Sequence, residues 1–241
     1  MATTNASTDA KWGPSLTDIL QRRPTWDKFN HEDLSTMAHE ISHGIHSDLR
    51  IKRPSTPKLN GFYVFGGQGA VVLEPSFRKA DVAALVPQSL RGSRYAHYLA
   101  GQKDWDDRPL YVWDEWNAYV NGAAVAMERY SLGLQQYPAG NTNDRVFAVL
   151  EFTIYALTVL HAAEQRDPQY LTREPQAREF FAWNAQRAMR VFQAGRHLPP
   201  FRWGASDTLE QALRTSPDAE QLRQSARRLL GAGLTQQTFG F

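Results

Sequence analysis

Residues Met37–His46 read MAHEISHGIH, and the fold and chemistry expected for this chain depend on this stretch. Side chains four residues apart lie on the same face of an α-helix, so His39 and His43 can reach one metal ion. Glu40 is turned from His39 by about a hundred degrees around the helix axis. Its carboxylate is therefore expected beside such an ion and near a bound water, but not as a ligand.

The residues around this stretch predict one long helix over His31–Ile51. Asn30 is a suitable N-cap, and Glu32 and Asp33 would lie in the first turn, where negative charge favours the helix dipole. Apolar residues recur at helical spacing, at Leu34, Met37, Ile41, Ile45 and Leu49. The two histidines are then expected in the middle of a helix, where their spacing brings them together.

The rest of the chain predicts a mainly α fold with a small β-hairpin, of the α+β class. The hairpin is expected over Leu59–Glu74, where two apolar runs flank a glycine-rich turn at 66–69. Residues 1–14 predict a disordered leader, because small polar residues bury little surface, and residues 15–241 predict a single domain. Further helices are expected over Ser15–Arg23, Arg78–Leu90, Ser93–Ala100, Leu110–Leu134, Asp144–Arg166, Pro175–Arg196, Asp207–Arg214 and Pro217–Leu230.

The composition excludes several classes of protein. The 241 residues contain no cysteine, which rules out disulfides and thiol catalysis and leaves histidine and carboxylate as the metal ligands. A net charge of +2 is too small to indicate a nucleic-acid partner. The N-terminal region lacks the apolar core of a secretory signal, so we expect a cytoplasmic location or export by a route that needs no signal peptide.

The segment Asp144–Arg166 approaches the length of a membrane span, which is about twenty residues. Polar residues interrupt its apolar run, namely Glu151, Thr153, Thr158 and His161. Such side chains are rare and costly inside a bilayer. The segment therefore predicts a core helix, and no membrane insertion is expected.

A hydrolytic zinc site has three protein ligands and keeps a fourth position for water, so the motif lacks one ligand. His46 is on the correct face, but it lies about 10 Å from His39 along a straight helix axis. That separation is too large for one ion unless the helix breaks at Gly44. We therefore expect His46 beside the site rather than on the metal.

Residues Trp113–Tyr119, which read WDEWNAY, supply the missing half of the pattern. Glu115 followed by Ala118, together with the HExxH motif at 39–43, resembles the gluzincin group of zinc metallopeptidases. In that group a glutamate from a downstream helix completes the site. The resemblance implies a zincin-like fold, with His39, His43 and Glu115 as zinc ligands and Glu40 as general base.

The chain departs from this group one turn after Glu115, where many members carry an acid that orients a histidine. This chain has Tyr119 at that position, and Asp114 and Asn117 are the alternatives for orienting the histidine. Tyr119 is instead a candidate donor of a hydrogen bond to an oxyanion, or a packing residue. The β segment also follows the HExxH helix, whereas the usual substrate-binding sheet precedes it.

Small residues supply a second argument for Glu115. Ala118 and Gly122 follow it on one face of its helix, and Gly44 lies next to His43. Helices that meet through such residues can approach closely, which a short bond between a carboxylate and a metal ion requires. The sequence therefore predicts that the HExxH helix packs against the helix that carries Glu115.

Other residues compete with these assignments. Glu151 is the main rival third ligand, although a core hydrogen bond to a tyrosine or arginine is the alternative for a carboxylate in so apolar a helix. Glu128 is a weaker rival that we expect to face solvent. The remaining polar and aromatic candidates are expected to be structural, namely His97, His161, His197 and the pair Trp113 and Trp116.

These residues predict a zinc-dependent metallohydrolase, a peptidase whose partner is a peptide or protein substrate. The hairpin either adds a substrate strand to its edge or is purely structural. One alternative is a non-catalytic regulatory or interaction protein on a zincin-like scaffold. Another is a bacterial effector or toxin protease delivered into other cells. Substrate preference and oligomeric state cannot be read from these residues.

Overall fold

The computed structural model describes residues 11–53, 58–139 and 143–241. These residues form a mainly helical fold with a two-stranded antiparallel sheet, which confirms the expected fold class at that level. The α-helices are α2 (Pro14–Arg22), α3 (Leu34–Ile51), α4 (Lys79–Leu85), α5 (Tyr111–Ser131), α6 (Arg145–Arg166), α7 (Tyr170–Arg173), α8 (Pro175–Gly195), α9 (Ser206–Thr215), α10 (Glu220–Leu230) and α11 (Ala232–Phe239). The strands and short helical turns are β1 (Leu59–Val64), β2 (Gln68–Leu73), η1 (Gln88–Leu90), η2 (Tyr95–Gly101), η3 (Lys103–Trp105), η4 (Pro199–Phe201) and η5 (Pro217–Ala219).

The helix with the HExxH motif, α3, begins at Leu34, so the predicted start at His31 with Asn30 as cap was wrong. Asp33 is the N-cap, and its carboxylate accepts a hydrogen bond from the Ser35 amide at 3.1 Å. It also accepts from the hydroxyls of Ser35 and Thr36, each at 2.9 Å. The amide bond satisfies one orphan N–H group of the first turn, the hydroxyl bonds hold the Asp33 carboxylate in place, and together they fix where the helix starts.

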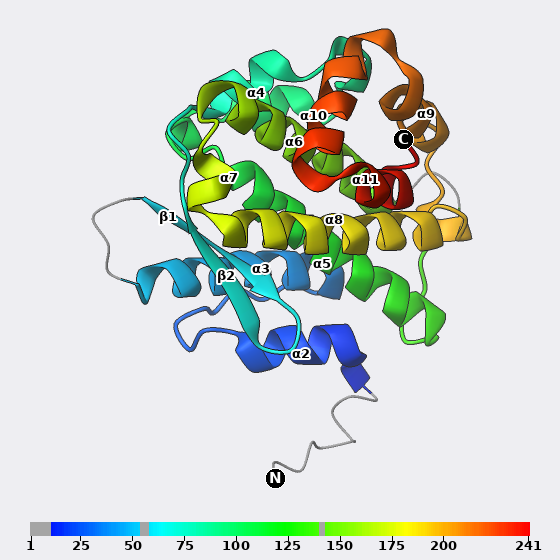
Figure 1. The fold of residues 1–241 in the computed structure, drawn as a ribbon. Helices are drawn as coiled ribbons and strands as arrows, with labels where there is room; N and C mark the ends of the chain where they lie inside the picture. The colour runs from blue at the N-terminus through cyan, green and yellow to red at the C-terminus, as the bar shows by residue number, and fades with distance from the viewer. Residues whose placement is uncertain (1–10, 54–57, 140–142) are drawn as a thin grey trace.

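Helix α5 lies between α3 and α6 and packs against both (Figure 1). Trp113 and Trp116 on α5 are fully buried, as expected for packing residues. Their indole N–H groups bond to α6, at the Ala156 carbonyl (3.2 Å) and the Thr153 hydroxyl (3.0 Å). These contacts hold the helix that carries Glu115 against the centre of the core.

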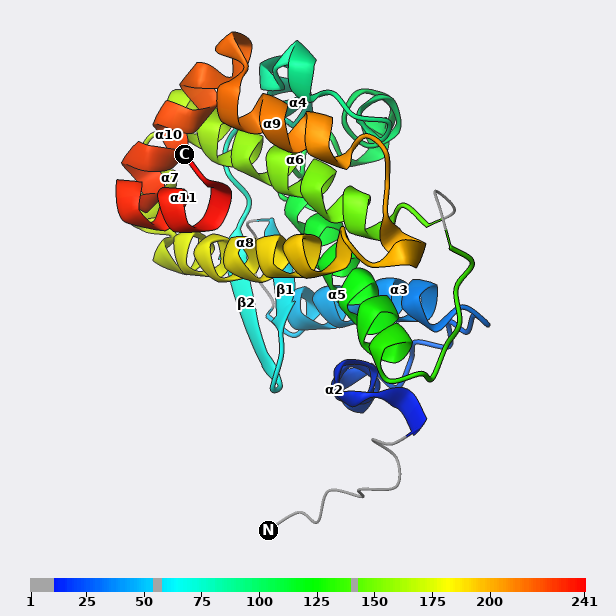
Figure 2. The ribbon, with the colours of Figure 1, turned by 90° about the vertical axis from the view of Figure 1, so that its right-hand side faces the viewer.

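Helix α6 is the central helix of the main apolar cluster. It is long and apolar enough to cross a membrane by length and composition, but its most apolar window is entirely buried within the fold. Figure 2 shows α6 enclosed by α5 and α8 on one side and by the C-terminal helices on the other. This arrangement is that of a core helix.

The hairpin pairs Leu59 with Leu73 and continues in register to a turn with positive φ at Gly66 and Gly67. The outer edge of β2 meets α8 rather than solvent. The amides of Val71 and Leu73 donate to the side chains of Gln176 (3.0 Å) and Glu174 (3.3 Å). Those amides are unavailable to a substrate strand, which favours a structural role for this edge.

The first described residues belong to the fold, so the predicted leader reaches too far into the chain. Helix α2 begins at Pro14, and its Ser15 amide and hydroxyl donate to Glu128 at 3.0 and 2.7 Å. Arg129 donates to the carbonyls of Lys11 and Trp12. Residues 1–10 of the leader lie outside the described residues, and the single domain over 15–241 remains a prediction.

Three further elements differ from the sequence-based expectation, namely α4, η2 and α11. The helix predicted over Arg78–Leu90 ends at Leu85, because Pro87 disfavours helical geometry at Val86, which adopts ψ 118°. The helix predicted over Ser93–Ala100 is a π-helix, η2, rather than an α-helix. Helix α11 was not predicted, since its polar residues show no apolar period and it follows a turn at Gly231 (φ +92°).

Candidate metal centre

Helices α3 and α5 bring His39, His43 and Glu115 together. The two Nε2 atoms lie 3.0 Å apart, and they lie 3.5 Å (His39) and 3.6 Å (His43) from Glu115 Oε2. The centre of this triangle is about 2.0 Å from all three atoms, which matches zinc–nitrogen and zinc–oxygen bond lengths of about 2.0–2.2 Å. The three ligand atoms expected from the sequence therefore have a separation that suits a single metal ion.

Glu115 presents a single oxygen atom to the histidines. Its Oε1 accepts a hydrogen bond from the Tyr111 hydroxyl at 2.6 Å. Its Oε2 is buried and has no hydrogen-bond partner among the described residues. Burial raises the pKa of Glu115, but the two histidine rings outweigh it and hold that pKa below its usual range. A buried, ionised oxygen without a hydrogen bond is costly unless a cation lies against it.

Asp114 holds the other side of the site. Its Oδ1 lies 2.5 Å from Nδ1 of His43 and 2.8 Å from Nδ1 of His46, and its Oδ2 accepts from Arg50 at 3.3 Å. Burial raises the pKa of Asp114, but His46 and His43 lower it by more, so its pKa lies below the usual range and the carboxylate is ionised. A carboxylate on Nδ1 directs Nε2 of His43 towards His39 and Glu115, the arrangement that orients metal-binding histidines.

His46 contacts the site without joining the three ligand atoms. It is fully buried, and its Nε2 lies 2.8 Å from Asn117 Oδ1. His43, His46 and Asp114 are also close enough to form a second metal-binding group. Their contacts are hydrogen bonds around one carboxylate oxygen, which places Asp114 in the orienting role considered from the sequence.

The close approach of α3 and α5 depends on Gly122. A Cβ atom at this position would lie 2.8 Å from the backbone carbonyl of Ser35 and 3.4 Å from Cβ of His39. The expectation for Gly44 was wrong: a Cβ there would meet the Asp27 side chain at 2.8 Å, so Gly44 faces the segment before α3. Only one of the two helices contributes a glycine to this contact.

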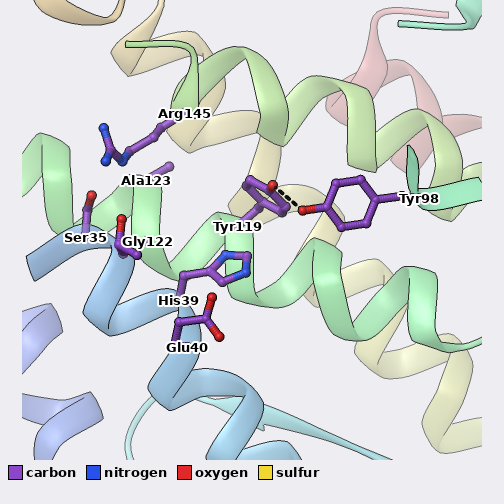
Figure 3. Close-up of a pocket in the computed structure, with 9 residues that line it drawn as sticks. Ser35, His39, Glu40, Tyr98, Tyr119, Gly122, Ala123 and Arg145 are labelled. Atoms are coloured by element: carbon purple, nitrogen blue, oxygen red, sulfur yellow. Dashed lines mark hydrogen bonds between the residues drawn. The ribbon is translucent and has the colours of Figure 1, made fainter. Parts of the chain in front are cut away.

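Two pockets open on either side of the ligand atoms. One, of about 180 Å³, contains Glu40 next to His39 and is called the Glu40 pocket below (Figure 3). The other, of about 250 Å³, includes His43, Glu115 and Trp105 and is called the Trp105 pocket. Within the described part of the chain Glu40 forms no hydrogen bond or ion pair, so its carboxylate is available at the surface of the first pocket.

Tyr119 lines the Glu40 pocket, and its ring packs edge-on against His39 with centroids 4.6 Å apart. Its hydroxyl is hydrogen-bonded at 2.8 Å to the hydroxyl of Tyr98 on η2, as Figure 3 shows. Burial raises the pKa of both tyrosines, so both keep their protons. No motif in the sequence marks Tyr98, which lies on the π-helical segment η2.

The rival ligands lie away from this cluster. Glu151 is fully buried and pairs with Arg94 at 2.6 Å, the kind of core interaction considered for it. Glu128, which was expected to face solvent, is partly buried and accepts hydrogen bonds from the amide and hydroxyl of Ser15. His161 bonds to Ser225 at 2.6 Å.

Three further residues at the site were missed, namely Tyr111, Trp105 and Arg145. Tyr111 carries a signal in the sequence, since it precedes Glu115 by one helical turn and can reach its carboxylate. Trp105 stacks on Tyr111 with a centroid distance of 4.9 Å, and it lies on the short turn η3, between two of the predicted helices. Arg145 lies on α6, a different helix from those that carry His39, His43 and Glu115.

No protein-family model matches this chain, and no curated protein or solved structure shows a match to it. The geometry of the described residues therefore carries the functional argument.

Proposed function

We propose that this protein is a zinc-dependent metallohydrolase that acts as a peptidase, with His39, His43 and Glu115 as the zinc ligands. The observation that carries the proposal is the triangle of ligand atoms, in which Glu115 Oε2 faces both Nε2 atoms and has no hydrogen-bond partner among the described residues. A purely structural ion would need no free carboxylate beside it. Glu40 supplies such a carboxylate at the edge of a pocket.

A zinc ion bound by these residues would lower the pKa of a water molecule towards neutrality and polarise a carbonyl group. Glu40 then accepts a proton from the attacking water and passes it to the leaving amine, which is the role of a general base and acid. Asp114 keeps His43 in the orientation that presents Nε2. Tyr111 holds the distal oxygen of Glu115.

The paired hydroxyls of Tyr98 and Tyr119 supply hydrogen-bond donors in the same pocket as Glu40. Only one hydroxyl of the pair donates to the other, so the accepting tyrosine has its own proton free for a developing oxyanion. This assigns transition-state stabilisation to the pair rather than to Tyr119 alone.

The test is to measure zinc content and hydrolysis of a mixed peptide library. Glu40→Gln should retain stoichiometric zinc and lose activity by a factor of at least about 100, the lower range for a general base. Glu115→Ala should lose zinc. Glu179→Gln, an exposed glutamate on α8, is the matched control and should behave like the wild type.

Two outcomes would overturn the proposal. If the wild-type protein binds no stoichiometric zinc, the proposed zinc site is wrong. Protein that binds zinc tightly but shows no turnover dependent on Glu40 would remove the peptidase and favour a non-catalytic role for the site.

A further inference from the structure

The Glu40 pocket ends in a positive charge. Figure 3 shows Arg145 beside Ala123 and Ser35, on the side of the pocket away from Glu40. Arg145 is the first residue of α6, whose N-terminus carries the positive end of the helix dipole. The pocket therefore has Glu40 and the metal ligand His39 at one end and a guanidinium group at the other.

Asp33 engages only one part of this guanidinium. Nη2 of Arg145 donates to Asp33 Oδ2, and the side chain of Arg145 remains 30% exposed. The same carboxylate also caps α3 through Ser35 and Thr36. A guanidinium has five N–H donors in a planar fork, and Nε and Nη1 of Arg145 have no partner within residues 11–53, 58–139 and 143–241. Arg145 can bind a second anion without releasing Asp33.

Among the described residues, no free carboxylate lies beside Arg145 to serve as its second anion. The nearest other acid in sequence, Asp144, is already paired with Arg94 at 2.6 Å. Besides Arg145, Glu40 and His39, the residues that line the pocket are small or carry hydroxyl groups, namely Ser35, Thr36, Tyr98, Tyr119, Gly122 and Ala123. A ligand group that reaches Arg145 from the metal end passes no other charge after Glu40.

The size of the pocket limits what can bind there. Its volume of about 180 Å³ is smaller than the pockets of about 300–1,000 Å³ that hold whole drug-sized ligands. A single amino-acid side chain is the appropriate occupant. The amides of Val71 and Leu73 already donate to Gln176 and Glu174, so a substrate cannot pair with them as an added strand. Binding of a substrate side chain in the Glu40 pocket is then the alternative source of affinity.

We infer that Arg145 forms a subsite for an acidic side chain, so that the substrate is a peptide with glutamate or aspartate next to the scissile bond. This inference rests on the proposed peptidase function. A substrate carboxylate would bind the outward N–H groups of the guanidinium, the geometry in which arginine recognises carboxylates. Arg145 is thus a specificity-determining residue and takes no part in proton transfer.

The experiment measures the binding of two peptide hydroxamates to zinc-loaded protein by calorimetry. The hydroxamates are identical except for a glutamate or a glutamine side chain beside the zinc-binding group. Wild-type protein should bind the glutamate compound about 10- to 100-fold more tightly, as expected for a charge-assisted hydrogen bond. Arg145→Gln should abolish the difference, and Arg145→Lys should retain part of it.

Two controls separate recognition from folding. Arg166→Gln makes the same change at the exposed far end of α6 and should leave the preference intact. Asp33→Asn keeps Arg145 but removes its internal anion, so the preference for glutamate should persist or increase.

Equal binding of the two hydroxamates to the wild type would overturn the acidic subsite while the metal site stands. A preference that survives Arg145→Gln would overturn the role of Arg145. If neither compound binds and no Glu40-dependent hydrolysis is seen, the proposed function falls together with the subsite.

Discussion

Tyr111 donates its hydroxyl hydrogen to Oε1 of Glu115 at 2.6 Å, and this bond selects which carboxylate oxygen faces the histidines. The tyrosine lies one helical turn before the glutamate and is fixed by stacking on Trp105. Because Oε1 accepts this hydrogen bond, Oε2 is the oxygen presented to the proposed metal ion. Glu115 is thereby set up as a ligand through one oxygen.

Tyr111→Phe is expected to weaken zinc binding by about 10- to 100-fold, the usual effect of removing a partner that orients a metal ligand. The phenylalanine ring keeps the stacking on Trp105, so the fold should persist. The affinity is measured by competition with a chromogenic chelator. Tyr130→Phe, on the same helix, is the control, and equal zinc affinity in the two variants would contradict the assigned role of Tyr111.

Asp114→Asn should reduce both zinc affinity and stability. Asp114 is a buried anion shared by His43, His46 and Arg50, and removing one partner of a buried charge network costs about 3–5 kcal/mol. Urea unfolding of the metal-free protein measures the loss in the free energy of unfolding separately from the loss of zinc affinity. An unchanged free energy of unfolding would show that this network contributes nothing to the fold.

Gly122→Ala tests the close approach of α3 and α5. The added methyl group would lie 2.8 Å from the Ser35 carbonyl, so the helices must separate, at a cost of about 1–3 kcal/mol for an overpacked contact. Zinc affinity should fall with stability, because His39 and Glu115 lie on the two helices. Gly233→Ala, where a Cβ meets nothing within 4 Å, is the matched control.

Asp33 is expected to make stability depend on acidic pH. Burial raises its pKa, but Arg145 and the hydrogen bonds from Ser35 and Thr36 lower it below 3.8 in the folded state. A group whose pKa falls on folding stabilises the protein above its unfolded pKa, and this contribution is lost as the pH falls through the folded value. Thermal unfolding should therefore show a loss below about pH 4.

Two variants separate the cap from the charge at this position. Asp33→Asn retains an acceptor for the Ser35 amide and should flatten the dependence on pH. Asp33→Ala removes the cap as well and should cost about 1 kcal/mol at neutral pH. Identical acid profiles in Asp33→Asn and the wild type would show that this carboxylate does not titrate with folding.

The local half of the site could be predicted, because its geometry follows from helix periodicity alone. His39, Glu40 and His43 need only one helix, and any helix over these residues places the histidines together. The start of that helix was harder to locate. Asn30 and Asp33 are both good caps, and Asp33 also pairs with Arg145, a residue more than a hundred positions away that the local sequence does not indicate.

The long-range half depended on tertiary packing. Glu115 could be proposed because small residues follow it on one face, and Gly122 does make the predicted close contact. Tyr98 and Arg145 gave no such signal, since nothing in a single sequence shows which turn of which helix faces a pocket. Gly44 shows the converse error: a small residue beside a ligand packs against Asp27 instead.

The contact between β2 and α8 has a consequence for the solution behaviour of the protein. An open strand edge is a template on which other chains can pair and aggregate. Here Gln176 and Glu174 accept hydrogen bonds from β2, and Tyr170 donates to the Leu73 carbonyl at 2.8 Å. A two-stranded sheet is marginally stable by itself. Side chains of α7, α8 and the residue between them thus make the hydrogen bonds that a third strand would make with β2, and they protect this edge from self-association.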